Sequence, residues 1–190
     1  MKLRDVFDDF RCQRALLKNL ETRSAQAGGD DFLRNVASFP GSDNLPIDPN
    51  RRRAEISRTI ERMYRRLDDF YLVGLVSAFE NFVFSKLQSA TRLAEHTLKE
   101  NYAPDAPVWT YRAGLAKTLA DFGQLGDLNS LFEKGLLTPD QTIKLRELIH
   151  LRSFIAHGRR QDWNRAKELN NFPVDVVSAY HLLKTIADSL

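Results

Sequence analysis

The residues best suited to chemistry are Arg152 and His157, which lie five positions apart near the C-terminus. A guanidinium is always charged, and its fork of donors matches a phosphate with two hydrogen bonds. An imidazole titrates near neutrality and can act as a general acid or a general base. Side by side, these two side chains could bind a phosphate group and transfer a proton next to it.

A helix predicted over residues 138–157 places Arg152 in an apolar arc. At about 100° of rotation per residue, Arg152 points among six apolar residues: Leu145, Leu148, Ile149, Leu151, Ile155 and Ala156. Glu80 lies in another strongly apolar helix, between Val73 and Leu87. Because an unpaired buried charge is costly, we expect Glu80 to lie near Arg152. The alternatives are an ion pair that only stabilises the core and a Glu80 that reaches out into a groove.

The string from Leu151 to Arg160 contains Arg152, then Ala156-His157-Gly158, then two arginines. It ends a long helix that follows an earlier, strongly apolar one. This pattern resembles the Arg-x4-His motif of HEPN domains, in particular stand-alone bacterial HEPN proteins of the RiboL-PSP type. The resemblance covers the chain from about Arg51 onward. It implies an all-α fold, a HEPN-like helical bundle with long central helices, to which this chain adds an N-terminal helix and a long irregular loop.

By this resemblance the chain is a metal-independent endoribonuclease that cleaves RNA through attack of the ribose 2′-hydroxyl, leaving a 2′,3′-cyclic phosphate. Arg152 would bind the phosphate and His157 would be the acid or base. Ser153 would orient the substrate or the histidine, and Glu80 would hold Arg152 in its rotamer. The candidate RNA-binding residues are Arg159, Arg160 and His150, although His150 also suits an ordinary position on the polar face.

Two positions depart from the pattern of the family. Family members usually carry Asn, Asp or His after the arginine, where this chain has Ser153. The alternative function is therefore a catalytically inactive HEPN-like module that binds RNA, nucleotide or a protein partner. Some HEPN toxins are silenced by modification of a tyrosine two places after the histidine, and here that position is Arg159. In a toxin–antitoxin or antiphage defence system, another antitoxin protein remains a possible partner.

The spacing of the motif raises a geometric problem. Five residues on an ideal helix place Arg152 and His157 about 140° apart. Either Gly158 lets the last turn unwind, or the groove is shared between two subunits, as is common in HEPN ribonucleases. The helix over residues 71–94 is apolar around most of its circumference, with more apolar surface than a small monomer needs to bury. We therefore expect a homodimer.

Composition indicates a globular protein of ordinary character. The 190 residues are 43% hydrophobic and 28% charged, with a net charge of +3. The arginine runs at 51–53 and 65–66 are interpreted as solvated helix faces, whereas a functional role is favoured for the arginine cluster after His157. Cys12 is the sole cysteine, and neither His150 nor His157 is followed three or four places later by an acidic residue or a cysteine, so we expect no disulfide, metal or other cofactor.

The N-terminus lacks the apolar core of a signal peptide, and the most hydrophobic run, 71–84, is too short to span a bilayer. We expect a cytoplasmic protein without membrane contact.

The chain is predicted to form one folding unit of two parts, an N-terminal helix plus irregular loop over 1–50 and the helical bundle over 51–190. The first helix spans about 2–27 and the loop spans 30–50. Residues 51–101 form one bent helix or two helices that meet near 67–71, and the absence of Gly and Pro there favours a bend. Shorter helices are expected over 111–122 and 128–133.

Two helix starts are predicted near the C-terminus. Thr138, Pro139 and Gln141 have the spacing of a capping box with proline in the first helical position. Residues 170–173 are expected to open the last helix. Its core-facing residues are predicted to be Val174, Val177, Tyr180, Leu183, Ile186 and Ala187.

Overall fold

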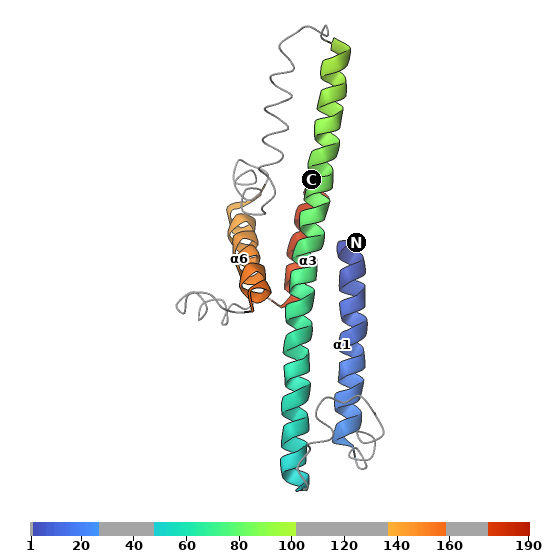
Figure 1. Ribbon diagram of the computed structural model, residues 1–190, viewed down its shortest axis with the longest axis vertical. Coiled ribbons are helices and arrows are strands. Elements are labelled where there is room, and N and C mark those ends of the chain that lie inside the picture. The colour runs from blue at the N-terminus through green and yellow to red at the C-terminus, as the bar shows by residue number, and fades with distance from the viewer. Residues whose placement is uncertain (1, 27–47, 102–136, 159–174) are drawn as a thin grey trace. The chain divides into compact units, whose positions relative to one another are not determined.

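The computed structural model of the protein describes residues 2–26, 48–101, 137–158 and 175–190 (Figure 1). These residues form four helices and no strand: α1 (Leu3–Ala25), α3 (Pro49–Asn101), α6 (Pro139–Ala156) and α8 (Val176–Ser189). The predicted all-α fold class is confirmed for this part of the chain. Two predicted helices, over 111–122 and 128–133, lie outside the described residues. The same holds for residues 30–47 of the loop predicted over 30–50.

Helix α3 is continuous over 53 residues, so no turn separates two helices near residues 67–71. The chain divides into two compact units whose boundary falls inside α3. We call residues 4–71 the N-terminal unit and residues 72–190, which cluster with 1–3, the C-terminal unit. Helix α3 contributes its first part to one unit and the rest to the other. The division at residue 50, between an N-terminal part and the bundle, stays a prediction.

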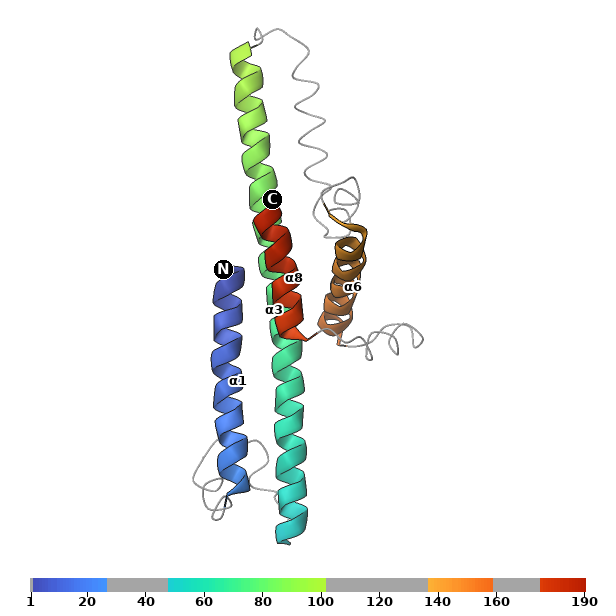
Figure 2. The same cartoon turned by 180° about the vertical axis from the view of Figure 1, so that it is seen from behind.

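In the N-terminal unit, α1 packs antiparallel to the first part of α3 (Figures 1 and 2). Ile56 and Ile60 form the buried centre of one contact, surrounded by Leu17, Leu20, Met63 and Tyr64. At the other end, the buried ring of Phe10 meets the edge of Tyr71, with 5.4 Å between the ring centroids. Residues late in α1 thus contact residues early in α3, and residues early in α1 contact residues further along α3, as antiparallel packing requires.

Polar side chains also join these two helices. Arg14 donates from Nη1 to Oδ1 of Asp68 at 2.9 Å, and its guanidinium carbon lies 5.5 Å and 5.6 Å from the ring centroids of Phe10 and Tyr64. The Tyr64 hydroxyl donates to Glu21 at 3.1 Å. A cation held over two aromatic rings contributes beyond its ion pair, so Arg14 is an anchor between the helices.

The Tyr71 hydroxyl is partly buried and donates to the Asp9 carboxylate. Burial, followed by this hydrogen bond, raises the pKa of Tyr71 to about 12. Burial and the hydrogen bond to Glu21 also raise the pKa of Tyr64. Both phenols therefore favour their neutral, hydrogen-bond-donating form in the folded state.

In the C-terminal unit, α6 packs against α8. Three helices bury apolar side chains in this unit. On α3 the chief ones are Leu75, Val76 and Phe79; on α6 they are Leu145, Leu148, Leu151 and Phe154; on α8 they are Val176, Ala179, Tyr180, Leu183 and Ile186. Helix α8 begins with Asp175 as N-cap, whose carboxylate accepts from the backbone N–H of Ser178 at 2.9 Å.

The predicted core faces of α6 and α8 require correction. Val177 is predicted in the core, but 42% of it is exposed. At 100° per residue Val176 lies within about 40° of the buried Tyr180 and Leu183, whereas Val177 lies about 60° or more from both, so Val176 is buried instead. On α6, Phe154 is fully buried, whereas the expected Ile149 is half-buried and Ala156 is exposed at the helix end. Val174 and residues 170–173 lie outside the described residues.

None of the helices in the described ranges combines the length and the apolar character that crossing a lipid bilayer requires.

Candidate functional site

Helix α6 carries the predicted motif, and its start is well defined. Thr138 is the N-cap, and its hydroxyl accepts from the backbone N–H of Gln141 at 3.3 Å. The Gln141 side chain accepts from the backbone N–H of Thr138 at 3.0 Å, and Pro139 occupies the first helical position. The predicted capping box is confirmed. It satisfies two helix-end donors and so fixes the start of α6 at Pro139, 13 residues before Arg152.

The predicted proximity of Glu80 and Arg152 is confirmed. Nη2 of Arg152 on α6 lies 3.5 Å from Oε2 of Glu80 on α3. The two side chains are 36% and 28% exposed, so the pair lies at the edge of the core, not inside it. At this distance and exposure the attraction is modest, about 1 kcal/mol or less. Glu80 can therefore orient Arg152 without removing its guanidinium from solvent.

One atom of Arg152 stands out among the described residues. Its Nε is buried and has no hydrogen-bond partner there. A guanidinium carries five N–H donors, and the contact with Glu80 uses only one end of the fork. An anion that approaches Arg152 could therefore reach only the exposed part of the side chain, which is 36% exposed as a whole, and not the buried Nε.

His157 is exposed and forms the C-cap of α6. Its backbone N–H still donates to the Ser153 carbonyl at 3.0 Å, the bond of a regular helix, and the left-handed turn comes only at Gly158, with φ of 65°. The last turn therefore does not unwind before His157. Because the helix stays regular, His157 leaves it about 140° around the axis from Arg152, and the explanation based on unwinding is wrong for this structure.

The other predicted site residues fall into two groups. Ser153 and His150 are half-buried on α6, on the side of the helix where His157 also lies. Arg159 and Arg160 lie outside the described residues. The structure thus brings Glu80 to Arg152, and it keeps Ser153 and His150 on the His157 face, away from that ion pair.

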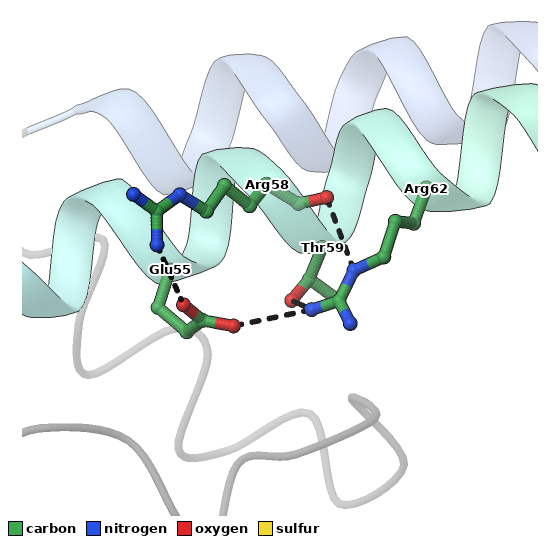
Figure 3. A network of polar contacts seen from close by, with 4 residues as sticks. All are labelled: Glu55, Arg58, Thr59 and Arg62. Carbon is green, nitrogen blue, oxygen red and sulfur yellow. Dashed lines mark hydrogen bonds and ion pairs between the residues drawn. The ribbon is translucent and has the colours of Figure 1, made fainter.

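A network on α3 was not anticipated as a site. Glu55, Arg58, Thr59 and Arg62 are linked by hydrogen bonds and ion pairs (Figure 3). The only sequence signal for it is the spacing of Glu55 to the other three by three, four and seven positions, which places them on one helix face.

In the described ranges, no group of three or more His, Cys, Asp or Glu residues is placed to hold a metal ion. Comparison of the chain with protein-family models, with curated proteins and with solved structures finds no match.

Proposed function

We propose that this chain is a metal-independent endoribonuclease of the HEPN type, in which Arg152 binds the scissile phosphate and His157 transfers a proton. The observation that carries the proposal is the state of Arg152: its guanidinium is held by Glu80 at 3.5 Å, yet the side chain remains 36% exposed. A cation that is oriented but not neutralised suits an incoming phosphate. His157, exposed at the end of the same helix, is accessible to the same substrate.

The chemistry requires two proton transfers. The 2′-oxygen of a ribose loses its proton to a base and attacks the adjacent phosphorus, while the bond from phosphorus to the 5′-oxygen of the next nucleotide breaks. The leaving oxygen takes up a proton, so the products are a 2′,3′-cyclic phosphate and a free 5′-hydroxyl. Imidazole can serve at either proton transfer. The Arg152 guanidinium would stabilise the negative charge that develops on the phosphate oxygens.

The site requires two copies of the chain. Because Arg152 and His157 leave α6 about 140° apart, one copy would supply the arginine and its partner the histidine to a shared groove. Large apolar side chains remain exposed on α3, with Phe84 at 40% and Leu93 at 69%, and exposed apolar surface favours association. The resemblance to HEPN proteins adds a setting, a toxin–antitoxin or antiphage system in which RNA cleavage arrests growth.

A second candidate function is a catalytically inactive module that binds RNA, nucleotide or a protein. Its supporting observation is that His157 is the C-cap of a regular helix and points away from the ion pair of Arg152 with Glu80. In that case both residues have purely structural roles. The two candidates differ in whether His157 is needed for RNA cleavage.

The test is cleavage of RNA by purified protein in the presence of a chelator, followed by analysis of the product ends. We expect 2′,3′-cyclic phosphate ends with the wild type and at least about 100-fold slower cleavage with His157→Ala, the usual scale for losing an acid–base group. His181→Ala is the matched control, because His181 is also an exposed histidine but lies on α8. Equal rates for all three proteins would favour the inactive module.

Sharing of the site between copies has its own test. Arg152→Ala and His157→Ala should each be inactive alone, but their mixed dimer restores one site, with Arg152 from one copy and His157 from the other. With random exchange, half of the dimers are mixed and each has one intact site of two, so about a quarter of the wild-type activity should return. A mixture that stays inactive while mixed dimers form would contradict the shared site.

A further inference from the structure

Exposed arginines cover one side of the first part of α3, within the N-terminal unit. They are Arg51, Arg58, Arg62, Arg65 and Arg66. At 100° per residue they fall within an arc of about 100°, on the side away from the buried Ile56 and Ile60, and they extend along about 22 Å of the helix axis. We call these five residues the arginine face.

The centre of the arginine face is ordered by Glu55 (Figure 3). One carboxylate oxygen of Glu55 lies 3.1 Å from Nη2 of Arg62, and the other lies 3.6 Å from Nη1 of Arg58. Nη2 of Arg62 also donates to the hydroxyl of the buried Thr59 at 3.0 Å, and its Nε donates to the Arg58 carbonyl at 3.4 Å. Arg62 is therefore held in place before any ligand binds, which lowers the entropic cost of binding.

The carboxylates do not neutralise the arginine face. Glu55 serves two arginines, Glu61 pairs with Arg65, and Asp48 lies 3.8 Å from Arg51. Asp69 lies in the same arc at 100° per residue, so five arginines face four carboxylates, a net charge of +1. Exposed ion pairs of this kind contribute about 1 kcal/mol or less, so a phosphate can join or displace them at low cost.

The type of residue narrows the class of partner. Every basic residue between Pro49 and Tyr71 is an arginine. Lysine would serve equally well for solubility or for ion pairs within a helix, whereas the planar fork of arginine matches phosphate oxygens. A linear row about 22 Å long fits a strand with a phosphate at every residue better than a single small anion.

We propose that the arginine face binds the phosphate backbone of an RNA strand, as a contact separate from Arg152 and His157. The inference rests on the proposed RNA substrate, but its test measures binding and not cleavage. The His157→Ala protein is therefore the background for every measurement, and a labelled oligouridine is the probe.

The test variant is the triple substitution Arg58→Gln, Arg62→Gln and Arg65→Gln. Glutamine has a helix propensity close to that of arginine, and the three side chains are exposed, so the fold should survive, as circular dichroism can verify. We expect the affinity for oligouridine to fall about 10-fold or more. The slope of log affinity against log salt should become shallower by about 2, since each phosphate contact to a single strand contributes about 0.7.

The chain offers a matched control on α1. Arg4, Arg11 and Lys18 are exposed, lie on one face at intervals of seven residues and all belong to the N-terminal unit. Their triple substitution by glutamine removes the same formal charge and should change the affinity less than twofold. The triple Arg→Lys variant at 58, 62 and 65 retains the charge and should preserve most of the salt dependence.

Three outcomes would overturn the proposal: equal losses of affinity in the two glutamine variants, an unchanged affinity in the Arg58, Arg62 and Arg65 variant, or competition by polyglutamate as strong as that by unlabelled oligouridine. The last would identify an acidic protein as the partner. If the wild type cleaves RNA but the arginine face is dispensable for binding, only this inference fails. If binding depends on the arginine face but no cleavage occurs, only the proposed nuclease activity fails.

Discussion

At the scale of single residues, Tyr71 links the helices of the N-terminal unit through its buried ring and its hydroxyl. Its pKa is raised to about 12 by burial and by the Asp9 carboxylate, whereas in an unfolded chain it is about 10. Because the folded pKa lies above the unfolded one, stability that is fully present below pH 10 is lost as the pH rises to 12. We expect the free energy of unfolding to fall over this range.

Tyr71→Phe tests this expectation by denaturant titration at a series of pH values. Near pH 7 the variant should be destabilised by about 1.5–3 kcal/mol, the value of a hydrogen bond to a charged acceptor. Between pH 10 and 12 its stability should fall less steeply than that of the wild type. Parallel curves for the two proteins would show that Tyr71 does not carry the pH dependence.

Of three polar contacts between helices, the sequence pattern predicted one. Glu80 and Arg152 each interrupt an apolar arc, and a charge in such a place needs a partner, so their proximity followed from the pattern. The contacts of Asp9 with Tyr71 and of Arg14 with Asp68 could not be predicted in this way. Asp9 and Arg14 belong to the polar part of α1, where many positions are equally polar, and their partners are 62 and 54 residues away.

At the scale of helices, the start of α6 depends on the capping box. Thr138→Ala removes the hydroxyl that accepts from the Gln141 N–H, and it should lower the free energy of unfolding by about 1 kcal/mol. Thr142→Ala is the control, because it makes a similar change one turn later, inside the helix, where alanine has the higher propensity. Thermal or denaturant unfolding compares the two. A loss for Thr142→Ala as large as that for Thr138→Ala would refute the role of the cap.

Helix positions were easier to predict than helix faces. The predicted first helix over 2–27 and the predicted helical stretch over 51–101 agree with α1 and α3 within about two residues, because Gly28-Gly29 and Pro49 punctuate the chain. The face of α8 was partly wrong, since Val177 is exposed. With Val176 and Val177 adjacent, the core face of the helix could include either residue, about 100° apart, and the structure buries Val176.

The regular helical geometry of α6 limits what the candidate site can do within one copy of the chain. Arg-x4-His on a helix separates its two side chains by about 140°, and only coordinates could decide whether Gly158 relieves this separation. The retained bond from the His157 N–H to Ser153 shows that it does not within one copy. The pattern therefore predicted the pairing of Glu80 with Arg152 and named candidate site residues. It did not predict how His157 would reach a phosphate bound by Arg152.

At the scale of the whole molecule, the division into two compact units was not predictable from composition. No Gly, Pro or polar linker marks the boundary between Tyr71 and Leu72, which lies inside a continuous helix. The units differ in their cores. Among the residues that the structure describes, the N-terminal unit buries few large apolar side chains, chiefly Phe10, Ile56, Ile60 and Tyr71, whereas the C-terminal unit buries apolar residues from three helices. Opening of the N-terminal unit alone should therefore cost less free energy than opening of the C-terminal unit.

Ile60→Ala tests this difference by native-state hydrogen exchange. Ile60 is 3% exposed at the contact between α1 and α3, and its truncation should cost about 2–4 kcal/mol. The amides of α1 should then exchange at least about 30-fold faster, since about 1.4 kcal/mol corresponds to a factor of ten. The amides in the middle of α6 and α8 should keep their protection, because their core does not include Ile60.

Leu183→Ala, in the fully buried face of α8, is the reciprocal control and should lower protection in α6 and α8. A uniform loss of protection along all four helices in Ile60→Ala would mean that the units unfold together, since a single cooperative transition distributes any local destabilisation over every amide that it exposes.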